Sequence, residues 1–243
     1  MPDLKLIKIK SEMFSRKIGN KLGVDVKMTD EEVLMKQLKY NKIDLILDIG
    51  ANTGQFSNMI FKLGYKGRIV SFEPLSSAYT LLKKKSGKFK NWEIAEQCAI
   101  GDEDGEIEIN ISKNSISSSI LKIMKEHVTA APDSEYIGSE KVKVYKLDTI
   151  ADKYSKGAKN IFIKIDTQGF EEKILNGANN FLKKAKGLLI ETSLVPLYEG
   201  QALFPQIFDR ITKQGFELYG VQPAFINKDT GRMLQIDAIF FRG

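Results

Sequence analysis

Apolar residues along the chain form short runs that alternate with longer helical patterns. The clearest run extends from Leu45 to Ile49, is interrupted only by Asp48, and ends at Gly50. A short apolar run that ends at a glycine predicts a buried strand. From about Thr53 onward the apolar spacing changes to that of a helix. The pattern therefore predicts a strand, a tight glycine turn and a helix in succession.

The same reasoning predicts the other elements. Further strands are expected at 67–73, 93–100, 106–112, 141–147, 161–165, 187–192, 216–219 and 235–242, and helices at 29–40, 77–85, 119–127, 171–177 and 204–214. Alternating strands and helices predict a parallel sheet, and the last two strands are expected to pair antiparallel at its edge. The turn signal Asp104-Gly105 predicts a hairpin between the strands that contain Cys98 and Glu106, with 141–147 as a further partner.

The glycine turn after the first strand is the strongest chemical signal. Gly50 and Gly54 allow unusual φ angles and a close approach to a ligand. The dinucleotide fingerprint G-x-G-x-x-G fails, because Asn52 and Gln55 stand where it requires glycine, and this argues against a nicotinamide oxidoreductase. Asp48 would repel a phosphate. An acidic, glycine-lined pocket better suits a ligand with an ammonium, a sulfonium and a ribose, and S-adenosyl-L-methionine is such a ligand. Its expected contacts in this stretch are Asp48, Gly50, Asn52 and Gly54.

Carboxylates at the ends of other strands support this cofactor. Glu73 follows the glycine turn by about 20 residues, where an acidic side chain binds the ribose hydroxyls in doubly wound sheets. Asp166 ends a later strand. Because ligands bind outside the carboxyl ends of such strands, Asp48, Glu73, Ala99 and Asp166 are expected to converge on one crevice. The alternative is that Asp48 is only capped and Glu73 is a solvated loop residue.

The strand that ends near Ile100 supplies candidates for the adenine. Ala99 and Ile100 would form an apolar wall, and Asp102 would bind the exocyclic amine, although a plain turn residue is the alternative for Asp102. The serine cluster at 114–119 would form either a lid over the site or a flexible linker.

Seven motifs follow one another along the chain: LDIGANTGQFS (Leu47–Ser57), SFEP (Ser71–Pro74), CAIGDEDGEIEI (Cys98–Ile109), NSISSSI (Asn114–Ile120), IKIDTQGFEEKILNGA (Ile163–Ala178), VPLYEGQALF (Val195–Phe204) and DAIFFR (Asp237–Arg242). In this order they resemble the FkbM family of S-adenosylmethionine-dependent methyltransferases. The resemblance covers the chain from about Lys42 to its C-terminus. It implies a Rossmann-like class I methyltransferase fold of the α/β class, with a mostly parallel seven-stranded sheet, an antiparallel edge strand and an inserted β-hairpin.

The resemblance also implies O-methylation of a hydroxyl on a sugar, a glycan or a polyketide-like small molecule. Asp166, Glu191 and His127 are the candidates for a base that takes the hydroxyl proton. His127 is the only histidine, and it is expected at an exposed helix end. Glu171 matches the family pattern. Gln168 stands where the pattern commonly has glutamate, so we expect no acid or base role at this position.

Composition limits the alternatives. The 243 residues carry a net charge of +6, which raises RNA methylation by the same fold as an alternative. The lysines are spread along the chain or clustered on predicted helices, and no RNA-recognition signature occurs, so no nucleic-acid partner is expected. A non-catalytic module that binds S-adenosylmethionine is the other alternative. With one histidine and one cysteine, no metal cluster is expected, although magnesium bound by carboxylates stays open.

The N-terminal region is expected to form a helical extension at 1–40, followed by a methyltransferase domain at 41–243. Within the N-terminal extension, residues 4–22 have the pattern of a basic amphipathic helix, which we expect to pack on the methyltransferase domain. Dimerisation or peripheral contact with a membrane surface are the alternatives. There is no apolar run of about 18 residues and no secretory signal, and the single cysteine excludes an internal disulfide. We therefore expect a cytoplasmic protein, and the oligomeric state stays open.

Overall fold

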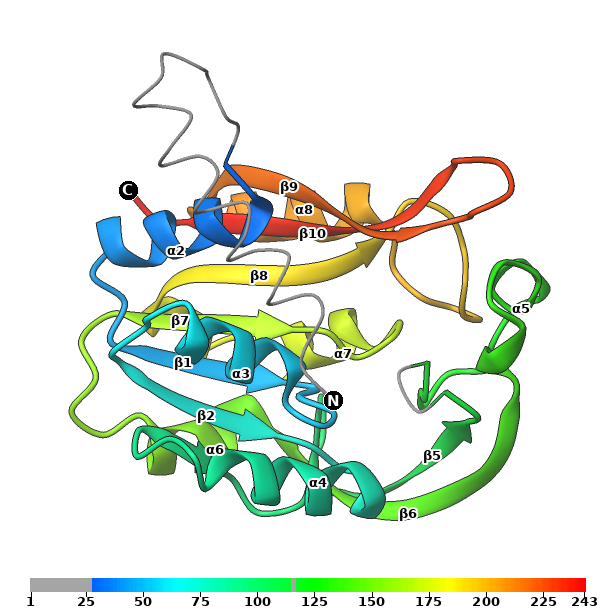
Figure 1. The fold of residues 1–243 in the computed structure, drawn as a ribbon, viewed down its shortest axis with the longest axis horizontal. Helices are drawn as coiled ribbons and strands as arrows, with labels where there is room; N and C mark the ends of the chain where they lie inside the picture. Colours follow the sequence, from blue (N-terminus) through cyan, green and yellow to red (C-terminus); the bar gives the residue numbers. More distant parts are fainter. Residues whose placement is uncertain (1–27, 115–116) are drawn as a thin grey trace.

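Two β-sheets organise the computed structural model, which describes residues 28–114 and 117–243 (Figure 1). In spatial order the larger sheet contains β3 (Trp92–Ile94), β2 (Arg68–Phe72), β1 (Leu45–Ile49), β7 (Ile161–Ile165), β8 (Ala185–Ser193), β10 (Met233–Phe241) and β9 (Glu217–Ile226). The neighbours from β3 to β8 are parallel, whereas β10 is antiparallel to both β8 and β9. The predicted α/β fold, with a mostly parallel seven-stranded sheet and an antiparallel pair at its edge, is confirmed.

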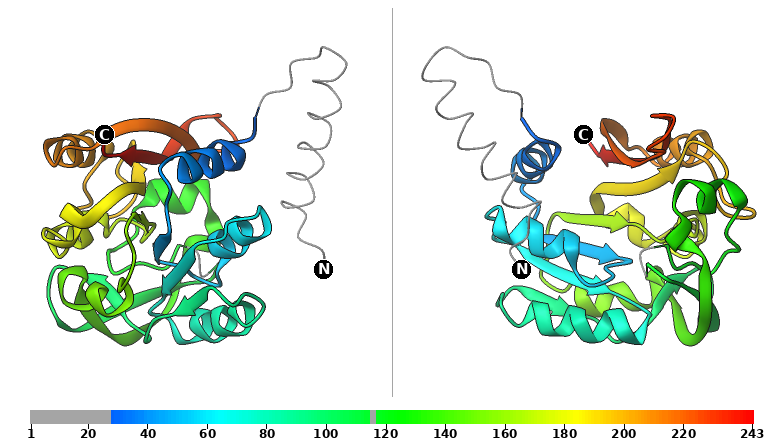
Figure 2. Two further views of the ribbon diagram at one scale, coloured as in Figure 1. Left: turned by 90° about the vertical axis from the view of Figure 1, so that its left-hand side faces the viewer. Right: turned by 45° about the vertical axis from the view of Figure 1, so that its right-hand side comes forward.

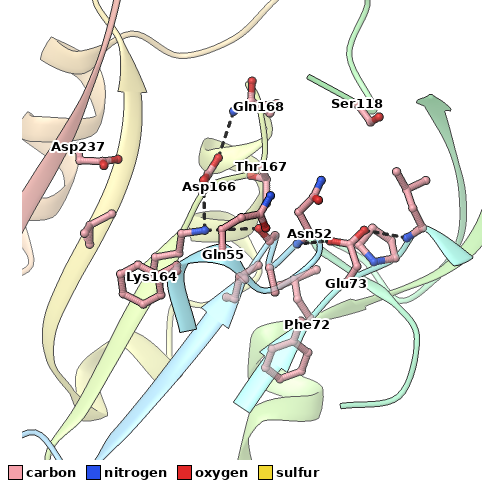
Figure 3. Close-up of a pocket in the computed structure, with 18 of the residues that line it drawn as sticks. Asn52, Gln55, Phe72, Glu73, Ser118, Lys164, Asp166, Thr167, Gln168 and Asp237 are labelled. Carbon is pink, nitrogen blue, oxygen red and sulfur yellow. Dashed lines mark hydrogen bonds and ion pairs between the residues drawn. The ribbon is translucent and has the colours of Figure 1, made fainter. Parts of the chain in front are cut away.

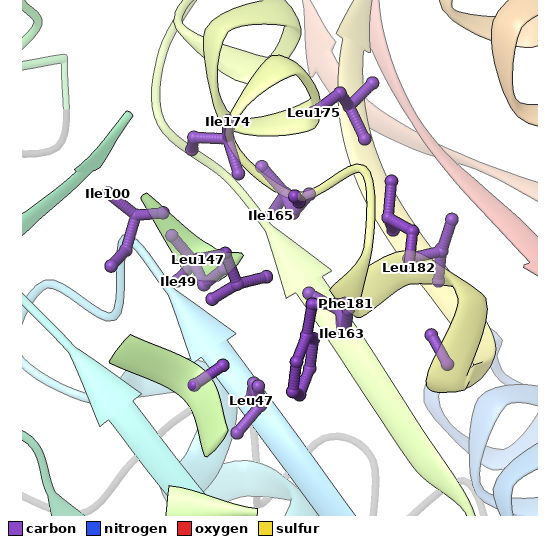
Figure 4. Packing of buried hydrophobic residues seen from close by; sticks show 14 of the residues in the cluster. Leu47, Ile49, Ile100, Leu147, Ile163, Ile165, Ile174, Leu175, Phe181 and Leu182 are labelled. Carbon is purple, nitrogen blue, oxygen red and sulfur yellow. The ribbon is translucent and has the colours of Figure 1, made fainter. Parts of the chain in front are cut away.

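Helices cover both faces of this sheet (Figure 2). Apolar residues of α2 (Asp30–Tyr40) and α3 (Gln55–Lys62) pack on one face together with α4 (Ser76–Ser86). The other face is covered by α6 (Leu147–Tyr154), α7 (Glu171–Asn176), the short helix η2 (Phe181–Lys184) and α8 (Phe204–Lys213). Leu47 and Ile163 lie at the centre of this second cluster (Figure 4). Burial on both faces explains why the central strands are almost continuously apolar.

The smaller sheet has the order β4 (Ala99–Gly101), β6 (Tyr136–Lys146) and β5 (Gly105–Ser112). Strand β5 pairs antiparallel with β6, which confirms the predicted pairing with the 141–147 segment. The predicted hairpin between the strands of Cys98 and Glu106 is wrong, because β6 lies between β4 and β5. The single strand expected at 93–100 is also wrong, because the chain leaves the larger sheet after Ile94 and enters the smaller one at Ala99.

The segment between β5 and β6 contains α5 (Lys125–Ala130) and η1 (Pro132–Ser134). The helix expected at 119–127 is therefore wrong, since α5 begins six residues later. The preceding residues bond to neighbouring loops instead, as in the bond from Met124 N to Leu197 O at 2.9 Å.

The N-terminal helix begins as its sequence predicts. Thr29 Oγ1 accepts a hydrogen bond from Glu32 N at 3.2 Å, and Thr29 N donates to Glu32 Oε2 at 2.9 Å, so the capping box is formed. The amphipathic helix expected at 4–22 lies outside the described residues, and the domain boundary at 40/41 stays a prediction. In the part of the chain that the structure describes, no helix is long and apolar enough to cross a bilayer.

Candidate active site

A cavity of about 900 Å³ lies at the carboxyl ends of β1, β2 and β7 (Figure 3). Gly50 and Asn52 line it from the turn after β1, Glu73 from the end of β2, and Asp166 from the end of β7. Ala99 of the smaller sheet lines the same cavity. Five residues that the sequence selects for cofactor binding thus surround one space.

Gly50 lies where β1 and β7 end side by side. Its φ is +75°, and a Cβ atom there would lie 1.9 Å from the carbonyl oxygen of Asp166, so a larger residue would displace the strand end. Asn52 follows in the left-handed region, with φ +48°. Gly54 begins α3 but does not line the cavity; a Cβ atom there would lie 2.6 Å from the ring of Trp92. The two glycines therefore fit the turn against β7 and against Trp92.

The buried carboxylate of Glu73 joins this turn to β2. Its Oε2 accepts a hydrogen bond from Asn52 N at 2.7 Å, and its Oε1 accepts one from Leu75 N at 3.0 Å. Burial raises the pKa of Glu73 to about 7, although the two backbone N–H groups and the charge of Lys164 oppose this shift. Glu73 is thus held at the cavity wall in a position where its charge depends on pH.

A buried ion-pair group lies beneath the turn. Lys164 Nζ is 3.4 Å from Asp48 Oδ1 and 3.1 Å from Asp166 Oδ2. Burial lowers the pKa of Lys164, but the two carboxylates outweigh it and raise the pKa above its ordinary value. Asp48 is fully buried, accepts a hydrogen bond from Ser57 Oγ at 2.7 Å and does not line the cavity. The sequence analysis missed Lys164, although a lone charge in the apolar strand IFIKI was the available signal.

Asp166 is also bonded to a network of buried side chains. Gln168 Nε2 donates to Asp166 Oδ1 at 3.1 Å and to Glu191 Oε2 at 2.6 Å. Tyr198 Oη donates to Gln168 Oε1 at 2.8 Å, which fixes the orientation of the amide. Gln235 Nε2 donates to Glu191 at 2.9 Å. Glu191 lies behind Gln168 rather than on the cavity wall, and burial, with the charge of Asp166, raises its pKa.

His127 lies away from the cavity. Its ring packs edge-on against Tyr198, with centroids 5.1 Å apart, and lies 5.3 Å from the ring of Phe225. The expected exposed position is wrong, because only 2% of His127 is exposed. Burial lowers the pKa of His127 to about 4, so the imidazole is neutral at pH 7. Of the three candidate bases, only Asp166 lines the cavity.

The end of the cavity beyond Glu73 is largely apolar. Ala99 and Ile100 line it together with Ser118 from the segment between β5 and β6. Asp102 does not line it, and its carboxylate is 2.8 Å from Lys173 Nζ. Among residues 28–114 and 117–243, no group of three or more His, Cys, Asp or Glu side chains is arranged to hold a metal ion.

The strand order, the glycine turn after β1 and the carboxylate at the end of β2 agree with the Rossmann-like class I methyltransferase fold that the sequence motifs imply. The family described as "Methyltransferase FkbM domain" matches residues 48–218, and the chain belongs to this family.

The individual proteins that resemble this chain have low sequence identity to it. The 2-O-methyltransferase NoeI of Sinorhizobium fredii is 28% identical over 193 residues, which cover 76% of this chain and 77% of NoeI. Among solved structures, TehB from Haemophilus influenzae has a TM-score of 0.48 and 11% identity, over 94% of this chain and 66% of TehB. A SAM dependent methyltransferase from Aquifex aeolicus has a TM-score of 0.45 and 14% identity, over 87% of this chain and 89% of that one. Neither structural likeness bears on the site.

Proposed function

We propose that this methyltransferase uses S-adenosyl-L-methionine to methylate a hydroxyl group of a small molecule. The observation that carries the proposal is the placement of the glycine turn, Glu73 and Asp166 around one cavity. Membership of the FkbM family supports methyl transfer, and the name of the relative NoeI supports oxygen as the atom methylated.

The residues at the cavity fit this cofactor. The Glu73 carboxylate accepts one backbone hydrogen bond on each oxygen and keeps further lone pairs for ribose hydroxyls. Ala99 and Ile100 would flank the adenine, and the Gly50 turn allows close approach of the methionine part. Asp48 and Gly54 would support the turn from behind. S-adenosylmethionine would supply an electrophilic methyl carbon bound to a positively charged sulfur, and S-adenosylhomocysteine, a neutral thioether, would be the leaving group.

Asp166 is the residue we assign to the acceptor hydroxyl. Lys164 holds one of its carboxylate oxygens and Gln168 the other, so the group is fixed at the cavity wall. There it can accept the hydroxyl hydrogen and orient the oxygen toward the methyl carbon. Glu191 acts on this position only through Gln168, which makes it a positioning residue. His127 has no part in the proposed reaction.

The acceptor is proposed from the family resemblance as a sugar, a glycan or a polyketide-like molecule. A cytoplasmic location is proposed from the single cysteine, which suits a reducing compartment.

Thermal unfolding with two ligands tests the cofactor. The midpoint is measured over a concentration series of S-adenosylhomocysteine and separately of NAD. A ligand that binds only the folded state adds about 2.7 kcal/mol at a hundred times its dissociation constant. We expect an upward shift with S-adenosylhomocysteine alone, and loss of that shift in Glu73→Ala. No shift in well-folded protein would contradict the proposal.

A further inference from the structure

One stretch of the chain within the described residues is strongly basic. Residues 61–92 contain eight of the 37 basic side chains and one of the 31 acidic ones, Glu73, which is buried. The remaining residues thus carry 29 basic and 30 acidic side chains and are close to neutral. The stretch therefore carries a net charge of +7, which is larger than that of the whole chain.

Five exposed lysines of this stretch lie on α4 and in the segments that follow α3 and α4, and we call them the lysine patch. It consists of the exposed side chains of Lys66, Lys83, Lys84, Lys88 and Lys90. The segment after α4 packs against the end of α3, because Phe89 stacks on Phe61 with ring centroids 4.9 Å apart. Asn91 Nδ2 also donates to the carbonyl of Lys66 at 2.9 Å.

The patch borders the candidate active site. Lys88 lines the cavity, as do Lys62 at the end of α3 and Lys85 at the end of α4. Lys85 Nζ donates to Thr53 Oγ1 of the glycine turn at 2.9 Å. A partner bound on the patch would therefore lie beside the cavity.

The charges of the patch are not neutralised within the protein. In the described parts of the chain, 28–114 and 117–243, none of the five patch lysines forms an ion pair. Lys83 only lies over the ring of Tyr79, 5.5 Å from its centroid. Five like charges repel one another, and an anionic partner would relieve this repulsion.

The chemistry of the patch favours a lipid surface over RNA. RNA sites combine charge with aromatic faces and arginine forks that read bases. Here Phe61, Phe89 and Trp92 pack on one another, and the guanidinium of Arg68 is bonded to the carbonyl of Tyr154. The patch thus offers lysine charges, and α4 adds the half-exposed apolar side chain of Leu81 (51%). Lysine charges together with an exposed apolar side chain match the anionic headgroups and acyl boundary of a membrane.

We propose that the lysine patch docks the protein reversibly on an anionic membrane surface, with the mouth of the cavity beside the lipid headgroups. An acceptor carried in or on the membrane would then reach the site without crossing bulk water.

Vesicle co-sedimentation tests the proposal directly. The full chain is mixed with vesicles of phosphatidylcholine alone, or of phosphatidylcholine with phosphatidylglycerol, at low and then rising salt. The test variant is K83E/K84E/K90E, whose three lysines lie outside the cavity wall. The matched control is K122E/K125E/K228E, which makes the same change of charge at exposed lysines of the segment before α5, of α5 and of the β9–β10 turn.

We expect binding to the anionic vesicles only, and weakening as salt rises. Each lysine near such a surface contributes roughly fivefold in partitioning, so the patch variant should bind about a hundredfold more weakly than the control. Both variants should keep the thermal midpoint and the affinity for S-adenosylhomocysteine. Equal binding of the two variants, or no binding of the wild type at low salt, would overturn the proposal. So would binding of a fluorescent single-stranded RNA through the same lysines without binding to vesicles.

Discussion

The carboxylate of Glu73 bonds to the glycine turn and faces the cavity, and burial raises its pKa to about 7. Ribose hydroxyls are bound best by the ionised form, which is present above this pKa and is lost as the pH falls through it. We therefore expect the affinity for S-adenosylhomocysteine to decrease from pH 8 to pH 6. Titration calorimetry across this range measures it.

Glu73→Gln removes the titrating group. At pH 8 its dissociation constant should be about 10 to 100 times that of the wild type, as is typical for loss of a charged hydrogen bond. The exposed Glu93→Gln, with the same change of charge, is the control. A Glu73→Gln protein that binds as tightly as the wild type would remove Glu73 from the ribose site.

Glu171 is a second buried carboxylate with a raised pKa. Its Oε1 accepts hydrogen bonds from Thr167 N and Gly169 N, both at 3.1 Å, and burial raises its pKa to about 7. The folded state therefore holds a proton more tightly than the unfolded state, in which the pKa is about 4.3. The stabilisation that comes from this tighter proton binding is fully present below about pH 4.3. It is lost as the pH rises to 7, which lowers the free energy of unfolding by roughly 3 kcal/mol for this group.

Glu171→Gln keeps an oxygen acceptor for both backbone groups and removes the titration. We expect its free energy of unfolding in urea to fall less between pH 5 and pH 8 than that of the wild type. Glu172→Gln, at the exposed neighbouring position, should follow the wild type. Parallel pH curves for Glu171→Gln and the wild type would show that Glu171 is already ionised at pH 5.

Residues of the candidate site could be selected from the sequence where their position at the end of a strand was sufficient to place them. Gly50, Glu73 and Asp166 follow strands, so the rule that ligands bind at carboxyl ends of strands was sufficient to place them at one cavity. His127 and Asp102 lie in segments whose tertiary contacts no local pattern reveals. The ring of His127 packs edge-on against Tyr198, and Asp102 forms an ion pair with Lys173.

At the scale of elements, the segment between β5 and β6 closes one side of the cavity. Ser119 Oγ donates to the Gln168 carbonyl at 2.6 Å and accepts from Leu121 N at 3.0 Å. Ser119→Ala leaves both backbone groups without this partner, which costs about 1–3 kcal/mol of local stability. We expect faster amide hydrogen exchange in residues 117–124 and severalfold weaker binding of S-adenosylhomocysteine.

Ser77→Ala, at an exposed position of α4, is the control for this experiment. Hydrogen exchange measured by mass spectrometry reports the segment directly. If Ser119→Ala and Ser77→Ala exchange alike, the segment is held by its other contacts, such as the bond from Met124 N to Leu197 O.

The central elements could be predicted because their cause is local. Strand β7 begins and ends at the predicted residues, Ile161 and Ile165, since an apolar run between turn signals is sufficient to define it. The position of a strand within a sheet does not follow from the local sequence alone. Alternation at 106–112 predicts a strand, and its predicted pairing with 141–147 is confirmed, but the place of β6 between β4 and β5 depends on the course of the whole chain.

At the scale of the whole molecule, the two sheets share one hydrophobic core. Ile100 of β4 and Leu147 at the start of α6 belong to the same buried cluster as Leu47 and Ile163 of the larger sheet (Figure 4). The end of α7 touches β4 so closely that a Cβ atom on Gly177 would lie 1.9 Å from the carbonyl oxygen of Gly101. Sheets that share a core in this way should unfold together.

The single tryptophan and the single cysteine allow a test of this cooperativity. Trp92 begins β3 of the larger sheet, and Cys98 immediately precedes β4 of the smaller one. Cys98 is fully buried, and burial raises the pKa of its thiol to about 12, so it reacts only when the smaller sheet opens.

In urea we expect Trp92 fluorescence and pulse labelling of Cys98 to have the same midpoint, as a two-state transition requires. Ile109→Ala in β5 removes buried volume from the cluster that the smaller sheet forms with the start of α4, and costs about 2–5 kcal/mol. If the sheets unfold as one unit, this substitution lowers both midpoints equally, because the tryptophan then reports a loss of stability in a sheet to which it does not belong. A lower midpoint for Cys98 with an unchanged midpoint for Trp92 would instead show that the smaller sheet opens by itself, and that the wall formed by Ala99 and Ile100 can separate from the rest of the cavity while the larger sheet stays folded.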